Sequence, residues 1–255
     1  MGQRTTSRTR GSAAGSAHGV SALAALQTEI CDCRACPRLV SWREEVAQTK
    51  RRAYREWDYW GRPVPGFGDP QAWLAIVGLA PAAHGANRTG RIFTGDRSGD
   101  FLYAGLHRAG LANQATSTHR EDGLTLRGVY VTCPVRCAPP ANKPTPEELR
   151  QCTPFLDREL GLLPIQGILA LGALGWGASL EILQRQGVAL PKPRPVFGHG
   201  ALYRPEQGPW LLGSFHVSQQ NTQTGRLTPA MFDGVLAKAL GLRREGSRNE
   251  RARVP

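Results

Sequence analysis

The chain has 255 residues, a formal net charge of +12 and a pI of about 10.1. This length allows a substantial hydrophobic core, and no apolar run approaches the roughly 20 residues of a membrane helix. No signal-peptide pattern opens the sequence, so an intracellular, cytoplasmic protein is expected. Residues 1–19 and 242–255 each carry +3, which leaves +6 on the body. That basic body makes nucleic acid the leading partner, the alternative being a nonspecific basic surface.

The amino-terminal part of the chain changes in composition along its length. Residues 1–19 are mostly Ser, Gly, Ala, Thr and Arg, which predicts a disordered basic arm. A helix is expected from Ser21 to the first cysteines, because Ser is a good N-cap and apolar residues follow at helical spacing. Residues 42–69 are rich in Arg and aromatic residues and then in proline. They predict a helix followed by an irregular segment that wraps the body.

Strand and helix patterns alternate in the rest of the body. Apolar runs predict strands at residues 73–79, 128–132, 167–171 and 210–215. Helices are predicted around residues 101–109, from Thr145 onward, over 173–186 and over 228–241. This alternation predicts an α/β fold, a three-layer α/β/α sandwich around a four-stranded parallel sheet. We expect a single domain at residues 20–241, followed by a flexible basic tail at 242–255.

Polar loops follow three of the predicted strands. Their sequences are G-L-A-P-A-A-H-G from Gly78, C-P-V-R-C-A-P-P-A-N-K-P from Cys133 and H-V-S-Q-Q-N-T-Q-T-G-R-L from His216. The carboxyl ends of parallel strands meet at one edge of a sheet, where ligands bind. The loops are therefore expected to form one composite active site. The first loop lacks the glycine-rich phosphate fingerprints, which disfavours a nucleotide-phosphate-binding enzyme.

Side chains in these loops are candidates for chemistry, each with a structural alternative. Phe93 could stack on a base or anchor its loop in the core. Asp96 could cap a helix or present an ionised carboxylate to a substrate. His216 could be structural or could donate to a developing anion. The polar run 218–224 could be a flexible loop or could enter a DNA groove and replace an extruded nucleotide.

The chain contains six cysteines, which in an intracellular protein favour metal binding or catalysis over disulfides. Four of them form two pairs, which are Cys33 with Cys36 and Cys137 with Cys152. These thiolates could together bind zinc or a [4Fe-4S] cluster, and the spacing does not choose between them. The alternative is that the cysteines are unrelated and buried. Cys31 and Cys133 fall outside the pairs and are interpreted as packing residues.

In combination these motifs resemble the family 5, UDGb-type, uracil-DNA glycosylases. The resemblance rests on the loop from Gly78 to Asp96, the four paired cysteines with C-A-P-P-A-N-K-P, F-G-H-G at residues 197–200 and the segment from His216. It covers roughly residues 30–241. It implies a bacterial or archaeal base-excision repair enzyme and favours a [4Fe-4S] cluster over zinc at Cys33, Cys36, Cys137 and Cys152.

The resemblance also implies roles for individual residues. The catalytic residues are expected to be His216 for the departing base, Asp96 for the water or the sugar cation, and Asn142 as a further polar group. Base-binding residues are expected to be Phe93, Gly78, Ala80 and Cys133. Contacts to DNA are expected from Arg88, Arg91, Gln219, Gln220, Asn221 and Gln223.

The sequence departs from related families at positions that read the base. Leu79 and Ala80 stand where other uracil glycosylases have Asp, Asn or Glu, and Cys133 aligns with an asparagine of family 4. We therefore expect looser base choice, covering uracil and other deaminated bases such as hypoxanthine or xanthine. The expected enzyme is a nucleoid-associated monomer that flips these bases out of double-stranded or single-stranded DNA and hydrolyses the N-glycosidic bond.

A different class of function also fits the charge and the cysteines. The chain could be a noncatalytic iron-sulfur or zinc DNA-binding module that senses damage. That hypothesis leaves Phe93, Asp96 and His216 without a role at one sheet edge. A uracil-release assay distinguishes the two hypotheses.

Overall fold

Four parallel strands form the centre of the computed structural model, which describes residues 12–252. They are β2 (Leu74–Val77), β3 (Val129–Thr132), β4 (Gly167–Leu171) and β6 (Trp210–Ser214). Short antiparallel strands, β1 (Phe67–Gly68) and β5 (Leu202–Tyr203), extend the edges in the order β1-β3-β2-β4-β6-β5. The four predicted parallel strands are confirmed, whereas the sheet has six strands because two-residue edge strands leave no periodic signal.

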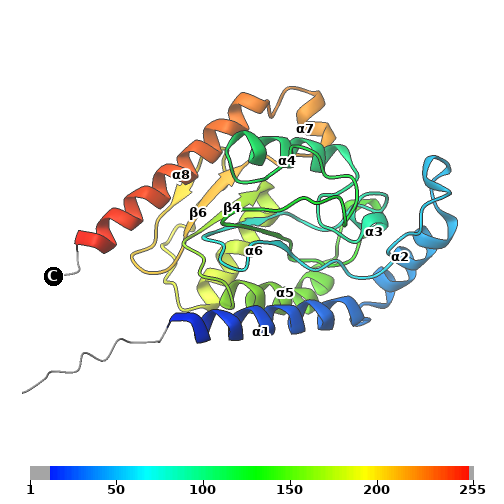
Figure 1. Cartoon of the computed structure of the whole chain (residues 1–255), viewed down its shortest axis with the longest axis horizontal. Helices are drawn as coiled ribbons and strands as arrows, with labels where there is room; N and C mark the ends of the chain where they lie inside the picture. Colours follow the sequence, from blue (N-terminus) through cyan, green and yellow to red (C-terminus); the bar gives the residue numbers. More distant parts are fainter. Residues whose placement is uncertain (1–11, 253–255) are drawn as a thin grey trace, which may run out of the picture.

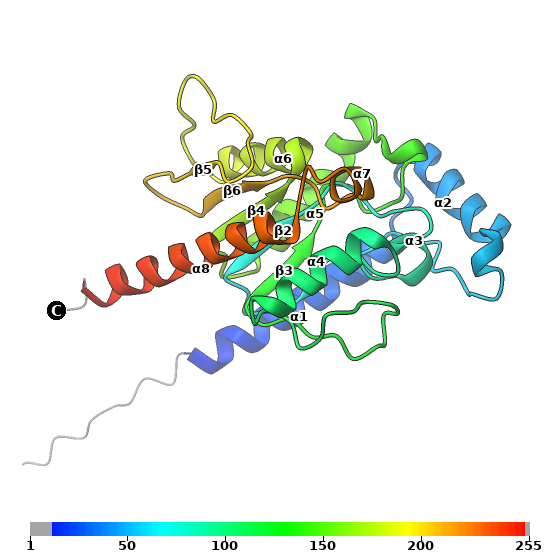
Figure 2. The same ribbon diagram turned by 90° about the horizontal axis from the view of Figure 1, so that it is seen from above.

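The side chains of each central strand alternate between two cores. In β2, Leu74 and Ile76 pack with residues of α4 (Arg97–Arg108) and α8 (Pro229–Ala252). Ala75 and Val77 point the other way, into a core shared with α5 (Pro146–Gly161) and α6 (Gly172–Arg185). Figure 2 shows α4 and α8 on one side of the sheet and α6 on the other. The predicted three-layer α/β/α sandwich is therefore confirmed.

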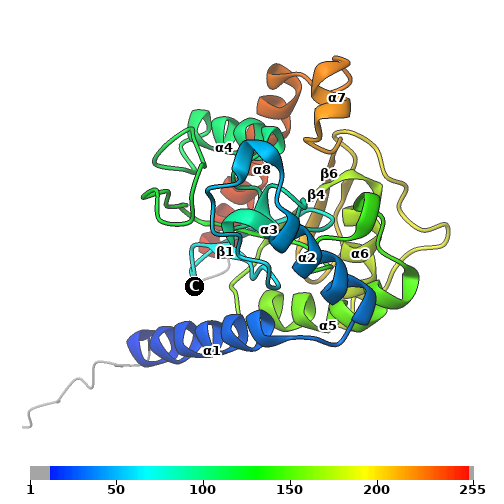
Figure 3. The same ribbon diagram turned by 90° about the vertical axis from the view of Figure 1, so that its right-hand side faces the viewer.

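Both terminal helices are longer than predicted. Helix α1 (Ser12–Asp32) begins before Ser21, so residues 12–19 are helical where a disordered arm was expected. It contacts α5, which Figure 3 shows next to it. Leu23 of α1 belongs to the same buried cluster as Leu163. Helix α8 continues through Gly241 to Ala252, because Gly241 lacks the positive φ of a helix-ending glycine and Leu242 is buried. The predicted tail is thus helical over 242–252, and residues 1–11 and 253–255 lie outside the described residues.

Short elements gather at the carboxyl ends of the parallel strands. They are α2 (Pro37–Thr49), the 3-10 turn η1 (Arg52–Tyr54), α3 (Ala86–Thr89), the 3-10 turn η2 (Pro140–Asn142) and α7 (Gln219–Gln223). Figure 1 shows α2, α3 and α7 at one end of the molecule, away from the carboxyl end of α8. No helix within residues 12–252 is both long and apolar enough to cross a membrane.

Candidate active site

A cavity of about 1150 Å³ opens at the carboxyl edge of the sheet. The loops after β2, β3 and β6 all contribute to its lining, as the sequence predicted. Among the lining residues are Phe93, Asp96, Asn142 and His216. The three candidate catalytic residues and the candidate stacking residue therefore share one cavity, although they are up to 123 positions apart in the sequence.

Asp96 is fixed at the amino terminus of α4. Its backbone is extended, and its Oδ1 accepts a hydrogen bond from the backbone N–H of Gly99 at 2.9 Å. Its Oδ2 lies against Gly85, where an added Cβ would overlap the oxygen. Burial raises the pKa of this carboxyl above its usual range. Asp96 is thus a helix cap, and it also lines the cavity, so the two alternatives for this residue coexist.

Phe93 holds a backbone conformation that is rare for residues other than glycine, with φ of +51°. Its ring lies against Gly78, on which a Cβ would be 2.8 Å from the ring. The ring also faces the imidazole of His216, with the two centroids 6.1 Å apart and the planes tilted by 38°. Gly78 therefore lies behind Phe93, and the absence of a side chain there lets the aromatic ring line the cavity.

His216 follows β6 directly. Burial lowers the pKa of its imidazole to about 4, so the ring is neutral near pH 7. Its backbone carbonyl accepts a hydrogen bond from Asn221 Nδ2 at 2.8 Å. On the opposite side, Gly172 at the start of α6 leaves room for the histidine Cβ. The imidazole itself forms no hydrogen bond within the described residues, so its nitrogens are free to meet a substrate.

Asn142 reaches the cavity from the loop after β3. Both Asn142 and the preceding Ala141 have positive φ, +55° and +52°. Asn tolerates this conformation, whereas Ala does so at an energetic cost, and such strain gathers at functional sites. The Asn142 side chain is exposed and makes no hydrogen bond within the described residues, so it can turn toward a ligand.

Comparison with known proteins identifies the family that shares this arrangement. Residues 65–240 match the model of the uracil DNA glycosylase superfamily. The chain belongs to this superfamily. A type-5 uracil-DNA glycosylase of Thermus thermophilus is 56% identical over 208 residues, which are 81% of this chain and 92% of the relative. Another, of Mycobacterium tuberculosis, is 54% identical over 225 residues, 88% of this chain and 82% of the relative.

The type-4 enzymes are more distant. The type-4 uracil-DNA glycosylase of Pyrobaculum aerophilum is 34% identical over 128 residues, half of this chain and 58% of the relative. The type-5 relatives instead span most of both chains. The resemblance drawn from the motifs is therefore confirmed at the level of the type-5 uracil-DNA glycosylases.

Of the predicted base-binding residues, Ala80 and Cys133 differ in whether they line the cavity. Ala80 lines the cavity, as Leu79 does. Cys133 does not line it, because its thiol is completely buried and donates to the carbonyl of Val135 at 3.0 Å. The prediction that Cys133 binds the base is corrected: this residue packs inside the fold behind the site.

Only some of the residues predicted to contact DNA line the cavity. Arg88, Gln219 and Gln220 line the cavity, whereas Asn221 and Gln223 do not. The amide of Asn221 is used internally, in the hydrogen bond to His216. Arg91 is buried and donates to Thr94, Ser117 and Asp122 at 2.7–2.9 Å. The prediction for Arg91 is corrected, because its buried side chain holds the loops. Asn221 is partly exposed and Gln223 is exposed, and their contacts to DNA stay predictions.

Part of the cavity wall comes from a segment that sequence reasoning missed. Arg51, Tyr54 and Trp57, which follow α2, line the cavity beside the predicted residues. From the sequence they are expected only to belong to a segment that wraps the body. The only feature of the sequence that could have indicated them is composition, a mixture of arginines and aromatic residues. No periodic pattern relates them to the distant loops.

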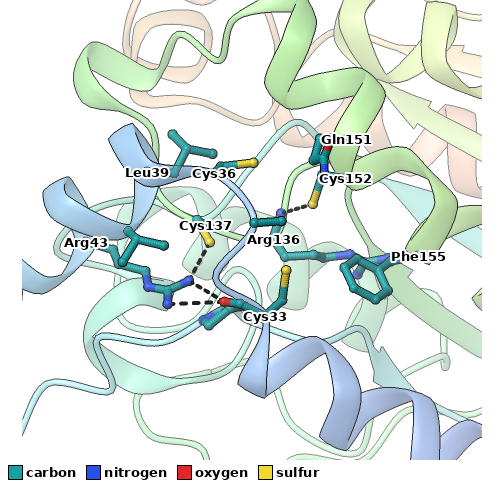
Figure 4. A pocket seen from close by; sticks show the side chains of 12 residues that line it. Cys33, Cys36, Leu39, Arg43, Arg136, Cys137, Gln151, Cys152 and Phe155 are labelled. Atoms are coloured by element: carbon teal, nitrogen blue, oxygen red, sulfur yellow. Dashed lines mark hydrogen bonds between the residues drawn. The ribbon is translucent and has the colours of Figure 1, made fainter.

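The paired cysteines surround a second, smaller cavity. Cys33, Cys36, Cys137 and Cys152 all line it, and Figure 4 shows their sulfur atoms around a common space. Two buried arginines, Arg43 and Arg136, also line this cavity. Within residues 12–252, no three Cys, His, Asp or Glu side chains converge closely enough to hold a single metal ion.

Hydrogen bonds connect these buried arginines to the thiols and to the fold. Arg43 Nη1 donates to Cys137 Sγ at 2.9 Å and to the Cys33 carbonyl at 3.2 Å. The backbone N–H of Arg136 donates to Cys152 Sγ at 3.3 Å. The Nε of each arginine is buried without a hydrogen-bond partner in the described part of the chain. Arg136 already has a buried carboxylate partner, Glu159 at 2.6 Å, whereas the carboxylate paired with Arg43 is Glu44 at 3.8 Å. Arg43 is therefore the buried cation that suits a group carrying negative charge.

Proposed function

We propose that this chain removes uracil from DNA by hydrolysing the N-glycosidic bond of a flipped nucleotide, which begins base-excision repair. The type-5 relatives are named uracil-DNA glycosylases, and the chain covers most of their length. The observation that carries the proposal is the single cavity that collects Phe93 and Asp96, Asn142, and His216 from the loops after β2, β3 and β6. The noncatalytic damage-sensing alternative gives this convergence no role.

The leaving base carries the negative charge as the N-glycosidic bond breaks. His216 is positioned to donate to it, because its neutral imidazole lies at the cavity wall with no competing hydrogen bond. One well-placed donor in a site shielded from water contributes about 3 to 4 kcal/mol, or on the order of 10² to 10³ in rate. Asp96, held by Gly99 and Gly85, supplies a fixed carboxylate for the sugar cation or for the attacking water.

Access to this cavity requires the base to leave the helical stack. Unstacking costs a few kcal/mol and is cheapest at mismatches, which contributes to selectivity. The Phe93 ring offers a face for the flipped base, and α7 places Gln219 and Gln220 at the cavity, where they can enter the groove. A monomer working on double-stranded or single-stranded DNA fits this arrangement, and a nucleoid location follows from such a substrate.

Base choice is proposed to be broad. Leu79 and Ala80 present no hydrogen-bonding side chain at the end of β2, and the buried Cys133 cannot read the base. A site without such groups imposes a small penalty on a base with different exocyclic atoms. Hypoxanthine and xanthine are therefore proposed as further substrates.

The paired cysteines are proposed to hold a [4Fe-4S] cluster. Zinc is the alternative, and it would need the four sulfurs about 2.3 Å from one ion. Within residues 12–252 no three such side chains converge closely enough for a single ion. A thiolate-bound cluster is anionic, which gives the buried Arg43 a counter-charge. When bound, the cluster would cross-link the segment before α2, the loop after β3 and α5. No step at the reacting bond is assigned to it.

A base-release panel tests the proposal. Duplex and single-stranded oligonucleotides containing one uracil, hypoxanthine or xanthine are incubated with excess protein, and free base is measured. We expect uracil release in both contexts, fastest from U opposite G in duplex DNA, and slower release of the purines. Binding of damaged DNA without release of any base would support the damage-sensing alternative instead.

A further inference from the structure

The segment from Lys50 to Tyr59, here called the strap, connects α2 to the residues that lead into the sheet. Figure 1 shows it projecting from the end of the molecule where α2 and α3 lie. It contains the short turn η1 and contributes little to the hydrophobic core, yet Arg51, Tyr54 and Trp57 line the glycosylase cavity. A projecting segment with so little apolar burial needs other contacts to hold its position.

Arg88 supplies the main contact. Its guanidinium lies between the Tyr54 and Trp57 rings, 3.9 Å and 4.0 Å from their centroids. The side chain is only 3% exposed and has no carboxylate partner within the described residues. Its Nε donates to the His84 carbonyl at 2.8 Å and its Nη2 to the Gly95 carbonyl at 2.7 Å. Arg88 therefore connects two aromatic rings of the strap to the loop that carries Asp96.

Two further contacts hold the strap. The Tyr59 hydroxyl and His84 Nδ1 form a hydrogen bond at 3.1 Å. The Trp57 ring lies 5.8 Å from the His119 ring. The strap is thus held at defined points beside the cavity, while its remaining side chains stay exposed.

Its exposed arginines lack acidic partners. Arg51, Arg52 and Arg55 are exposed and form no ion pair in the described part of the chain. Most other exposed arginines do, for example Arg158 with Glu29 and Arg185 with Asp157. The strap also carries the exposed acids Glu56 and Asp58, so its charge is mixed but positive. Unpaired arginines at the entrance of a cavity that takes a nucleotide are available for phosphate groups.

We propose that the strap is a DNA-binding element, in which Arg51, Arg52 and Arg55 contact backbone phosphates next to the flipped nucleotide. Arg88 is the positioning residue that holds the strap in place. This inference rests on the proposed function, since it takes DNA as the substrate. It assigns a role to a segment outside the loops that carry Phe93, Asp96 and His216.

The salt dependence of DNA binding tests the phosphate contacts. Binding of a duplex with one abasic-site analogue is measured at several salt concentrations for the triple variant Arg51→Ala, Arg52→Ala, Arg55→Ala. The log–log slope falls by about 0.9 for each phosphate that the protein no longer neutralises, so we expect a decrease of about 2 to 3 and at least tenfold weaker binding. The matched control is the triple variant Arg108→Ala, Arg158→Ala, Arg185→Ala. These exposed arginines stand at the carboxyl ends of α4, α5 and α6, at the opposite edge of the sheet.

Equal slopes for the two triple variants would overturn the inference, because nonspecific charge would then explain the whole effect. Absence of base release from wild-type protein would instead count against the proposed function, while the comparison of slopes would still test the strap. The two failures are therefore distinguishable.

The positioning role of Arg88 has its own readout. Arg88→Met should free the strap, so that trypsin cleaves folded protein faster after Arg51, Arg52 and Arg55. Tyr54→Ala should act in the same way, and the double variant should add little, because both changes disrupt the same stacking interaction. Arg88→Lys, which keeps a cation, should protect the strap partly. Wild-type cleavage rates in Arg88→Met would contradict the assignment.

Discussion

The Asp96 carboxylate lies directly against the backbone of Gly85, so closely that a Cβ on Gly85 would overlap Oδ2. The same carboxylate accepts from the Gly99 N–H through Oδ1. The residue before α3 and the first turn of α4 therefore fix one acidic group at the cavity. Neither contact involves the substrate, so the carboxylate is in position before DNA arrives, which is the condition for efficient electrostatic stabilisation.

Gly85→Ala should displace Asp96 and reduce uracil release. A shift of about 1 Å in a catalytic group can cost on the order of 10² in rate. Single-turnover kinetics on a uracil-containing duplex measures the effect. Gly177→Ala in α6 is the control, because a Cβ there meets nothing within 4 Å, and it should leave the rate unchanged. Equal rates for the two variants would show that Gly85 does not position the acid.

The capping and chemical roles of Asp96 can be separated by Asp96→Asn. Asn is as good an N-cap as Asp, so stability should change by less than about 0.5 kcal/mol, whereas Asp96→Ala should cost about 1 kcal/mol. Uracil release should fall in both variants, because neither carries the negative charge. Urea denaturation and single-turnover rates give the two readouts, and a fully active Asp96→Asn would restrict Asp96 to capping.

The ionisation of Asp96 should also appear in the pH profile. Burial raises the pKa of this carboxyl, so the rate should rise with pH through a value above the ordinary range of aspartate. This acid limb should be absent from the residual activity of Asp96→Asn. A limb that persists unchanged in the variant would belong to another group.

His216 should stay neutral well below pH 6.5. Its folded pKa of about 4 lies below the unfolded value, so the unfolded state takes up a proton first as the pH falls. Stability tied to this residue is therefore complete above pH 6.5 and is lost between pH 6.5 and 4, by about 3 kcal/mol in all. NMR titration of labelled histidine measures the ionisation directly. A His216 signal that titrates near 6.5 would contradict the buried, neutral imidazole.

Arg91 is expected to support the fold rather than DNA binding. Burial alone would raise the pKa of Asp122, but hydrogen bonds from Arg91 and backbone amides lower it to about 2. Arg91→Ala should cost about 3 kcal/mol, because it leaves this carboxylate without its buried partner. The contribution of this ion pair to the stability of the fold should be lost as the pH falls from about 4 to 2. Urea denaturation tests this, and a variant of wild-type stability with weakened DNA binding would restore the original prediction.

The cysteine cavity makes a prediction about metal content. Cys137→Ala should lose iron, visible absorbance and solubility together, because the proposed cluster connects three segments. Cys31→Ala is the matched control, since Cys31 does not line the cavity, and it should keep all three properties. Iron analysis and absorption spectra provide the measurements. A colourless Cys137→Ala that remained stable and active would refute the structural role.

Periodic patterns explain why the core of the fold was predictable from sequence. The apolar runs that became β2, β3, β4 and β6 are buried on both faces, and burial of that kind leaves a clear signal. The helix ends were less predictable: Gly241 looks like a terminator, but the burial of Leu242 favours continuation of α8. Edge strands of two residues carry no period at all.

Site residues were predictable where a reactive side chain lies in a loop that directly follows a parallel strand. Phe93, Asp96, Asn142 and His216 line the cavity as expected. The prediction that Arg91 contacts DNA was wrong, because Asp122 balances its charge. These two residues are more than 30 positions apart, and no local pattern reveals their pairing. Trp57 and Tyr54 were missed for the same reason, since only the fold brings them to Arg88.

In the proposed reaction, His216 stabilises the departing base from the wall of this cavity. The most direct measurement is the single-turnover rate of uracil release from a U·G duplex by His216→Ala, compared with wild-type protein at saturating enzyme. The rate should be lower by about 10² to 10³, with DNA binding largely retained. Release at the wild-type rate would contradict it.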